Sequence, residues 1–408
     1  MKCGLLGRKL GHSYSPQIHA HLGSYCYELF EREPEELEDF LKNGDFSAIN
    51  VTIPYKKDVI PYCTELSDRA RRLGAVNTIV RRADGSLIGH NTDYFGFEST
   101  IRRAGLDPAG KKVLVFGSGG ASNTAVAVLK EMGAQVTIIT HKENTPETLR
   151  KHGDTKLIVN ASPEGMYPKT GTSPAELDQF TPLEGVVDMI YNPARTKLLM
   201  DAAARGLVAE NGLWMLVAQA KESAEWFTGS SISDEVIASI HRELRLEMEN
   251  IILIGMPGSG KTTIGKLLAS KLHKQFADAD QVLSENASTS IPEIFATEGE
   301  SGFRIRETQT LQELGKQSAL VLATGGGCVT REENYPLLHQ NGTIFCLNRD
   351  ISRLPTDGRP LSQAGKLEQM YQVRKPLYER FADYQICNNG NPEETAAQIL
   401  ALLKQEEV

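Results

Sequence analysis

Residues 250–268 contain the stretch that most narrowly limits what this chain can fold into. They comprise an apolar run, a glycine-rich turn and a helical pattern, in the order NIILIGMPGSGKTTIGKLL. The turn GMPGSGKT (255–262) satisfies the spacing G-x-x-x-x-G-K-[ST], and it has the preceding strand and the following helix that this motif needs. Backbone N–H groups of such a turn and the helix N-terminus bind phosphate. The stretch therefore predicts a P-loop nucleotide site.

The residue types in this turn suit ATP bound together with magnesium. Lys261 would reach the outer phosphates, and Thr262 would ligate Mg²⁺. The residues expected to contact the nucleotide are Gly258, Ser259, Gly260, Thr262 and Thr263. The P-loop alone does not choose the molecule that receives the phosphoryl group.

The chain is too long for one ordinary core, because 408 residues normally divide into two or three domains. The join to the P-loop half lies near residues 248–250, without a Gly/Ser or Pro linker. We expect residues 249–408 to form one compact α/β kinase domain.

Composition excludes some partner classes. The net charge of -8 argues against a general nucleic-acid binder and against an anionic-membrane binder. The six cysteines form no CxxC pair, which indicates thiols in a reducing compartment. No apolar run reaches about 18 residues, and the first residues lack a signal-peptide pattern. We expect a cytoplasmic protein that binds small molecules; the composition leaves its oligomeric state open.

The first half carries a second glycine turn. Residues 111–140 read KKVLVFGSGGASNTAVAVLKEMGAQVTIIT, which predicts a strand, a turn, a helix and another strand. In this βαβ context, the turn at Gly117, Ser118, Gly119, Gly120 and Ala121 predicts a dinucleotide site with the pyrophosphate at the helix N-terminus.

Other elements follow from apolar patterns along the first half. We expect a strand in 46–55 that ends at Pro54, because proline removes a ladder donor. Buried strands are expected at 157–162 and 185–191, and helices at 34–45, 212–229 and 233–250.

Five segments after the P-loop carry polar or glycine residues at element ends. They are FADADQ (276–281), SGFRIRE (301–307), LATGGGCV (322–329), PTDGRPL (355–361) and VRKPLYERFADY (373–384). Three consecutive glycines after a strand allow a ligand to approach the backbone closely. Arginine suits bidentate pairing with a carboxylate.

In this order after a P-loop, these segments resemble the shikimate kinase family over residues 250–408. The resemblance implies that the protein binds shikimate through Asp280, Arg304, Gly326 and Arg374. It also implies that Asp278 lies near Mg²⁺, which it would help Thr262 to ligate, and near the attacking hydroxyl. Arg359, on a lid, would meet charge on the transferring phosphoryl group, with Lys261 as the other catalytic cation. The lid segment is short and proline-rich for the family, so the role of Arg353 is left open.

Four segments of the first half hold small polar donors: GHSYSP (11–16), NVTIPYKK (50–57), GAVNT (74–78) and GHNTDYFGF (89–97). Lys56 and Asp93 are the pair expected to serve proton transfer, because a carboxylate beside a lysine orients it.

These segments, with MIYNP (189–193) and LVAQA (216–220), resemble the shikimate dehydrogenase family over residues 3–245. The resemblance implies reduction of 3-dehydroshikimate, with Lys56 as proton donor and Ser13 and Ser15 on the substrate carboxylate. The residues implied to line the ring hydroxyls and the reacting carbonyl are Thr52, Lys56, Asn77, Asp93, Tyr191 and Gln219. Gly212 would contact the cofactor with the glycine turn.

The resemblance also implies a two-lobed α/β architecture. Residues 1–98 would form the substrate lobe, residues 99–213 the Rossmann-type nucleotide lobe, and helices in 214–245 would return to the first lobe. The P-loop kinase, a parallel sheet with flanking helices, would follow.

The choice of nicotinamide cofactor rests on residues 139–145, ITHKENT. NADP-preferring relatives usually carry N-R-T or N-R-S here, and this arginine is missing. His141 and Lys142 could meet the 2′-phosphate, and no acid at the strand end is expected to hold an NAD ribose. The family favours NADP, with NAD as an alternative.

Shikimate would be the product of the first half and the substrate of the second, which predicts a bifunctional enzyme of chorismate and aromatic amino-acid biosynthesis. One alternative gives the first half quinate as substrate, although the S-x-S-P form at Ser13 and Ser15 argues against it. Another is a metabolite sensor with one inactive half. Against that alternative, the residues expected to carry both reactions are all present.

Overall fold

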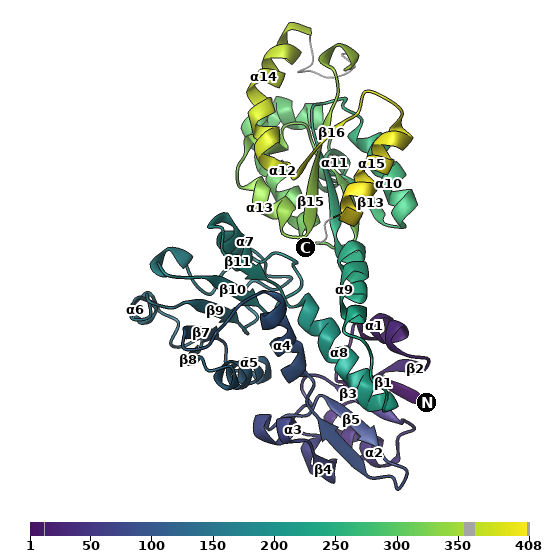
Figure 1. Cartoon of the computed structure of the whole chain (residues 1–408). Helices are drawn as coiled ribbons and strands as arrows, with labels where there is room; N and C mark the ends of the chain where they lie inside the picture. Colours follow the sequence, from purple (N-terminus) through teal and green to yellow (C-terminus); the bar gives the residue numbers. More distant parts are fainter. Residues whose placement is uncertain (12, 355–363, 406–408) are drawn as a thin grey trace. The chain divides into compact units, whose positions relative to one another are not determined.

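The computed structural model describes residues 1–11, 13–354 and 364–405. These residues divide into two compact units. Unit 1 comprises residues 1–165, 172–191 and 198–243, and unit 2 comprises residues 166–171, 192–197 and 244–408. Figure 1 traces their elements along the chain. All six cysteines are free thiols.

The first sheet of unit 1 has six strands in the order β2-β1-β3-β5-β6-β4. Its strands are β1 (Lys2–Gly7), β2 (Cys26–Glu31), β3 (Ala48–Val51), β4 (Glu65–Leu66), β5 (Thr78–Arg81) and β6 (Leu87–His90). Strand β1 pairs in parallel with β2 and β3, whereas β5 is antiparallel to β3 and β6. Strand β3 ends before Pro54, earlier than the expected strand, because a turn begins at Thr52.

The second sheet of unit 1 has five parallel strands in the order β11-β10-β9-β7-β8. They are β7 (Lys112–Phe116), β8 (Gln135–Ile139), β9 (Leu157–Asn160), β10 (Gly185–Asp188) and β11 (Val208–Glu210). Successive residues of β7 alternate between two cores: Leu114 and Phe116 pack in one, Val113 and Val115 in the other. A strand buried on both faces is a continuous apolar run, which is why the sequence pattern located it.

The helices of unit 1 cover these sheets. They are α1 (Ser15–Leu22), η1 (Pro34–Glu36), α2 (Leu37–Asn43), η2 (Ile60–Tyr62), α3 (Asp68–Leu73), α4 (Asp93–Arg103), α5 (Gly120–Glu131), α6 (Pro146–Arg150), η3 (Leu177–Gln179), α7 (Lys197–Ala204) and α8 (Leu213–Thr228). Helix α8 is joined to the first sheet through the buried hydrogen bond from Asn50 Nδ2 to Ser223 Oγ. Helix α9 (Glu235–Met248) runs from unit 1 into unit 2.

Unit 2 is built on a five-stranded parallel sheet in the order β13-β14-β12-β15-β16. Its strands are β12 (Asn250–Ile254), β13 (Gln275–Asp278), β14 (Leu320–Ala323), β15 (Gly342–Asn348) and β16 (Tyr384–Cys387). Along β12, Ile252 and Ile254 pack in one core, whereas Ile251 and Leu253 pack in the other. Both faces are therefore covered by helices, as a parallel sheet requires.

The helices of unit 2 lie on both sides of its sheet (Figure 1). They are α10 (Lys261–Leu272), α11 (Ala279–Ala287), α12 (Ile291–Gly315), η4 (Cys328–Thr330), α13 (Asn334–His339), η5 (Ile351–Arg353), α14 (Ala364–Phe381) and α15 (Pro392–Gln405). Helices α12, α13 and α14 share one core with the sheet, and α10 and α15 share the other. This places the turn between β12 and α10 at the carboxyl end of a central strand, where α/β sheets bind ligands.

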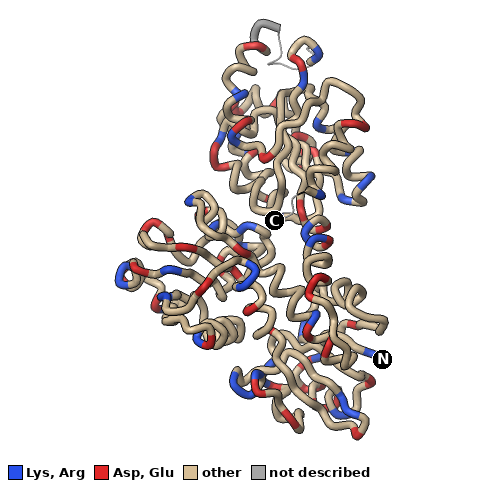
Figure 2. Tube along the Cα trace, viewed as in Figure 1, with Lys and Arg blue, Asp and Glu red and all other residues tan. Residues whose placement is uncertain are grey.

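Charged residues of both signs are interspersed along the described parts of the two units (Figure 2). Within the described residues, no helix has the length and apolar character that crossing a membrane requires.

Candidate active sites

A cavity of about 250 Å³ lies in unit 1, lined by residues of β1 and β3, of helices α1, α4 and α8, and of the segments that follow β10 and β11. The predicted residues that line it are Ser13, Ser15, Thr52, Lys56, Asn77, Asp93, Tyr191, Gly212 and Gln219. The remaining lining residues are Leu5, Asn50, Val51, Met189, Met215 and Leu216. Polar groups expected from six distant segments thus line one small cavity.

Lys56 and Asp93 form an ion pair on this cavity. Lys56 Nζ lies 2.6 Å from Asp93 Oδ2. Asn77 Nδ2 donates to the other carboxylate oxygen, Asp93 Oδ1, at 3.0 Å. Asp93 is the first residue of α4, where the helix dipole favours a negative charge. The carboxylate is therefore held from two sides, and it in turn fixes the direction of the lysine.

Further polar side chains line the same cavity. Tyr191 lies edge-on to Tyr14, with ring centroids 6.4 Å apart, and burial raises the pKa of its hydroxyl. Gln219 Nε2 donates to Leu216 O within α8 at 2.9 Å. Ser15 begins α1, and its backbone N–H donates to Ser13 Oγ at 3.2 Å. The cavity combines hydroxyl and amide donors with apolar side chains, as a site for a polyhydroxylated ring requires.

The expected dinucleotide turn joins β7 to α5. Gly117 has a φ of 116°, and a Cβ there would lie 2.7 Å from Ala161 O, so this position requires glycine. Gly119 caps α5, and a Cβ at Gly119 or Gly120 would meet nothing within 4 Å. The exposed N-terminus of a 12-residue helix therefore has room for a pyrophosphate, which fits the dinucleotide expectation.

The segment after β8 differs from the expectation that no acid lies at this strand end. Glu143 Oε2 accepts from Thr140 Oγ1 at 2.6 Å and from the Thr140 backbone N–H at 3.2 Å. These hydrogen bonds lower the pKa of Glu143. Glu143 lies three positions after Thr140 and folds back onto it through the turn. The apolar pattern that predicted the strand gives no sign of this turn. Exposed His141 and Lys142 lie in the same turn.

The P-loop joins β12 to α10 in unit 2. Gly258 and Gly260 have φ values of 82° and 98°, which favour glycine. Lys261 is buried, and its Nζ donates to Gly255 O at 2.9 Å and to Met256 O at 3.0 Å. The lysine ammonium therefore lies against the backbone of the loop.

Thr262 and Asp278, the two expected magnesium ligands, are in direct contact. Thr262 Oγ1 donates to Asp278 Oδ2 at 2.8 Å. Among the residues that the structure describes, no group of three or more His, Cys, Asp or Glu could hold a metal ion. One hydroxyl and one carboxylate fit Mg²⁺, which keeps several waters and takes its other ligands from substrate phosphates.

The residues expected to bind shikimate gather around the triple glycine after β14. Arg304 pairs with Glu307 at 2.7 Å, and a Cβ on Gly327 would lie 2.1 Å from Arg304 Nη2. Arg374 Nη1 donates to Gly326 O at 3.0 Å. Asp280, two residues after the end of β13, lies in the first turn of α11, and a Cβ on Gly325 would lie 2.8 Å from its Oδ1.

The lid segment contains two arginines, Arg353 and Arg359. Arg359 lies outside the described residues. Arg353 Nη1 donates to Asn389 O at 2.6 Å, and its Nε lies 3.8 Å from Asp350 Oδ2.

Three residues without an assigned role also belong to these sites. Asn50 lines the dehydrogenase cavity. The Tyr378 hydroxyl donates to Gly326 O. Buried Asn388 donates from Nδ2 to Ser259 O at 2.6 Å, which ties the P-loop to the end of β16. Asn50 and Tyr378 fall inside segments that the sequence had already marked, whereas Asn388 stands beyond them and carries no local signal.

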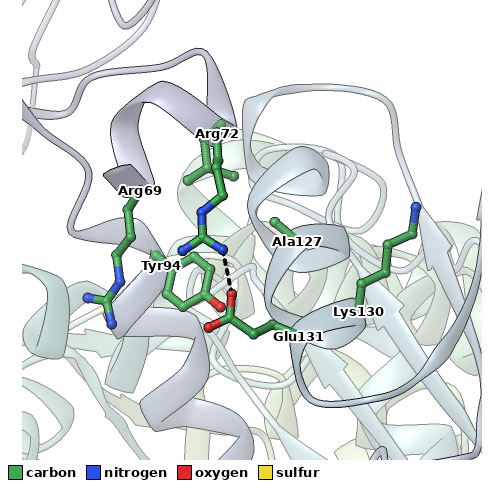
Figure 3. Close-up of a pocket in the computed structure, with 7 residues that line it drawn as sticks. Arg69, Arg72, Tyr94, Ala127, Lys130 and Glu131 are labelled. Carbon is green, nitrogen blue, oxygen red and sulfur yellow. Dashed lines mark hydrogen bonds and ion pairs between the residues drawn. The ribbon is translucent and has the colours of Figure 1, made fainter. Parts of the chain in front are cut away.

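A second cavity of about 440 Å³ lies among α3, α4 and α5 (Figure 3). Both arginines of this cavity have partners. Arg72 pairs with Glu131 at 2.9 Å, and Arg69 lies over the Tyr94 ring and pairs with Glu222 at 2.9 Å. Lys130 points away from this cluster in the figure. These ion pairs join helices to one another and argue against a site for an anion.

Two known protein families match this chain, one in each half. Residues 5–79 match the family described as shikimate dehydrogenase substrate binding domain, and residues 257–404 match the shikimate kinase family. A shikimate dehydrogenase (NADP(+)) of Caldicellulosiruptor bescii is 34% identical over 272 residues, which cover 59% of this chain and 93% of that protein. The shikimate dehydrogenase (NADP(+)) of Geobacillus kaustophilus is 34% identical over 254 residues, 55% of this chain and 92% of that protein.

Solved structures of other proteins resemble the first half of this chain. A chorismate mutase/shikimate 5-dehydrogenase fusion protein from Clostridium acetobutylicum is 35% identical, with a TM-score of 0.55, covering 60% of this chain and 96% of that one. Shikimate 5-dehydrogenase from Thermus thermophilus in complex with NADP(H) and shikimate is 29% identical, with a TM-score of 0.54, covering 60% and 99%. The expected α/β fold class and the pairing of two enzymes are confirmed. The chain belongs to the shikimate dehydrogenase family and carries a shikimate kinase domain in its second half.

Proposed function

We propose that this chain reduces 3-dehydroshikimate to shikimate with NADPH and then phosphorylates shikimate with ATP and Mg²⁺. One observation carries the proposal: a single small cavity gathers the predicted polar groups around the Lys56–Asp93 pair. Both substrates are small molecules, and the cytoplasm is the compartment that supplies both cofactors.

Lys56 and Asp93 move the proton in the first reaction. Bound NADPH would supply the hydride to the substrate carbonyl. The developing alkoxide needs a proton, and Lys56 Nζ donates it from the mouth of the cavity, where its side chain is 28% exposed. Asp93 orients the ammonium, and Asn77 orients Asp93. Ser13 and Ser15 hold the substrate carboxylate with their hydroxyls at the start of α1.

The substrate binds to the lobe formed by residues 1–98 and 214–245. The cofactor binds to the lobe formed by residues 99–213. The turn at Gly117–Ala121 and Gly212 contact the dinucleotide. Gly212 lines the cavity, and it lies so close to Met189 that a Cβ there would be 2.1 Å from Met189 O, so this position requires glycine. His141 and Lys142 meet the 2′-phosphate, since both side chains are exposed in the turn after β8.

Positioning and charge neutralisation carry the second reaction. Bound ATP with Mg²⁺ would supply the phosphoryl group. Arg304 and Arg374 hold the shikimate carboxylate, and Asp280 holds its hydroxyls at the triple glycine. Asp278 and Thr262 hold the metal near the attacking hydroxyl, and Lys261 and Arg359 neutralise the phosphates.

A coupled assay tests the proposal. The full chain receives 3-dehydroshikimate, NADPH, ATP and Mg²⁺, and shikimate 3-phosphate is measured by mass spectrometry. We expect phosphorylated product, with shikimate as its only precursor. A parallel reduction with NADH compares the cofactors, and oxidation of shikimate and of quinate with NADP+ compares the substrates; a higher kcat/KM for quinate would overturn the shikimate assignment.

Two single-site variants assign each reaction to its half. Lys56→Ala should abolish the reduction and spare phosphorylation of added shikimate, and Lys261→Ala should do the reverse. If one variant abolished both reactions, the two sites would not be independent as proposed.

A further inference from the structure

Ser223 lies at the centre of a buried polar cluster behind the dehydrogenase cavity. Its side chain is 0% exposed, and it belongs to α8. Three elements bring polar side chains to it. Asn50 Nδ2 lies 2.8 Å from Ser223 Oγ, and the hydroxyls of Thr78 and Thr92 each lie 2.9 Å from it. Thr78 and Thr92 are also fully buried.

Donor counting allows an arrangement in which every hydroxyl of this cluster has a partner. A hydroxyl has one hydrogen to donate and two lone pairs. Ser223 Oγ donates to Gln219 O at 2.9 Å and accepts from Asn50 and Thr92, while the Thr78 hydroxyl donates to Asn77 Oδ1 at 3.1 Å. The Thr92 hydroxyl, having given its hydrogen to Ser223, accepts from Asn77 Nδ2 at 3.0 Å. Each polar group then has a partner, as a buried network requires.

The same arrangement reaches the reacting groups. The second N–H of the Asn77 amide donates to Asp93 Oδ1 at 3.0 Å, and Asp93 Oδ2 accepts from Lys56. Asn77 Oδ1 accepts from the Thr92 backbone N–H at 2.8 Å, so the amide orientation is set by Thr92. Ser223 is therefore three hydrogen bonds away from the carboxylate that orients Lys56.

We propose that Ser223 is a positioning residue for the reduction, acting through Thr92 and Asn77 on the Asp93–Lys56 pair. This inference rests on the proposed function of that pair. Without the Ser223 hydroxyl, Thr92 loses the acceptor for its hydrogen, and that hydrogen can turn to Asn77 Oδ1 or Gln219 Oε1, at 3.3 and 3.4 Å. The Asn77 amide then holds Asp93 less firmly.

The test is Ser223→Ala in the full chain, with a matched control. Thr100 is equally buried, and its hydroxyl donates to the carbonyl four residues earlier, Gly96 O, at 2.8 Å. Thr100→Val removes a buried hydroxyl of the same kind outside the cluster. We expect S223A to lower kcat of the reduction about tenfold, the loss of roughly one buried hydrogen bond. KM for 3-dehydroshikimate should stay within about twofold, since substrate contacts remain.

The pH profile of kcat separates positioning from general destabilisation. The titratable side chains that line the cavity are Lys56, Asp93 and Tyr191. The profile should shift in S223A and stay unchanged in T100V, at equal kinase activity in both variants. S223A with the kcat and pH profile of the parent protein, or T100V with the same loss, would overturn the proposal.

A second variant covers the case in which S223A does not fold. Thr92→Val removes the hydroxyl between Ser223 and Asn77 and should shift the same profile. A folded T92V with the parent profile would also overturn the proposal. Absence of any reduction by the parent protein would instead reject the proposed function.

Discussion

Lys56 Nζ lies 2.6 Å from Asp93 Oδ2, although the two residues stand 37 positions apart in the chain. Lys56 belongs to the turn after β3, and Asp93 is the first residue of α4. Asn77, immediately before β5, bonds the other carboxylate oxygen. Three segments with no local signal of contact thus meet in one hydrogen-bonded group, and the predictions below depend on this and similar contacts.

Removing the Lys56 ammonium should lower kcat of the reduction by roughly 10²–10⁴-fold in Lys56→Ala, the usual contribution of a positioned proton donor. Kinase turnover should not change. Lys57 is exposed and adjacent, so Lys57→Ala serves as the control and should retain full reduction. Steady-state rates with NADPH measure both. Equal losses in the two variants would show that Lys56 has no special role.

Asp278→Asn should weaken the kinase, because an amide replaces the carboxylate beside Thr262. We expect an increased Mg²⁺ requirement and a fall in kcat of about tenfold or more, since a charged metal ligand is lost. Titration of Mg²⁺ at saturating ATP measures the effect. Glu285→Gln, which alters an exposed acid on α11, the helix that follows Asp278, is the control. An unchanged Mg²⁺ curve for D278N would contradict the metal assignment.

Arg304→Lys should raise KM for shikimate by about 10- to 100-fold and leave KM for ATP unchanged. Lysine keeps the charge and loses the planar fork that pairs with both carboxylate oxygens. Arg306, two residues along α12, pairs with Glu298 at the surface at 2.7 Å, so Arg306→Lys should change neither constant. A rise in both Michaelis constants for R304K would indicate general disruption of the domain.

Lys142→Ala should raise KM for NADPH about fivefold, the effect of one exposed cation beside a phosphate. NADH has no 2′-phosphate, so its KM should not change. Lys151, which pairs with Glu147 outside this turn, supplies the control variant Lys151→Ala. If Lys142→Ala raised KM equally for NADPH and NADH, Lys142 would not contact the 2′-phosphate.

Two buried histidines should make unit 1 sensitive to acid. Burial lowers the pKa of His90 from 6.5 to about 4 and that of His19 to about 3. The unfolded chain therefore binds protons that the folded chain excludes, so the stabilising contribution is present above pH 6.5 and is lost as pH falls towards 4. For His90 the loss amounts to about 3 kcal/mol.

Urea unfolding of the parent and of His90→Gln at pH 7, 6, 5 and 4 measures this dependence. The variant should lose less stability than the parent over this range, since it lacks one proton-binding group. His141→Gln removes an exposed histidine and should keep the parent slope. Parallel curves for the parent and H90Q would refute the prediction.

The local elements of both units were predictable because their signals lie in contiguous residues. The P-loop glycines need positive φ angles, and the helix expected at 212–229 is α8 (Leu213–Thr228). The nucleotide turn of unit 1 was recognisable for the same reason. The strand expected at 46–55 is shorter, because tight-turn hydrogen bonds begin at Thr52, where the apolar pattern continues.

Most of the site residues were predicted from the resemblance to two families. Those that the structure describes lie together in each half of the chain. Glu143 was overlooked because the acid is folded back on Thr140 through a turn. Ser223 and Asn388 were overlooked because each acts through a hydrogen bond to residues more than 100 positions away. A hydroxyl on a helix or an amide after a strand has no pattern that distinguishes such a role from an ordinary buried polar group.

By itself, the sequence determined the α/β class, both glycine turns and the order of the two enzymes, because backbone conformation and hydrophobic periodicity are local properties of the chain. Tertiary structure decided which polar groups face one another: Lys56 with Asp93, Thr262 with Asp278, and Ser223 with Thr92. Hydrogen bonds and ion pairs depend on distances of about 3 Å, and only the packing of distant strands and helices sets distances that short.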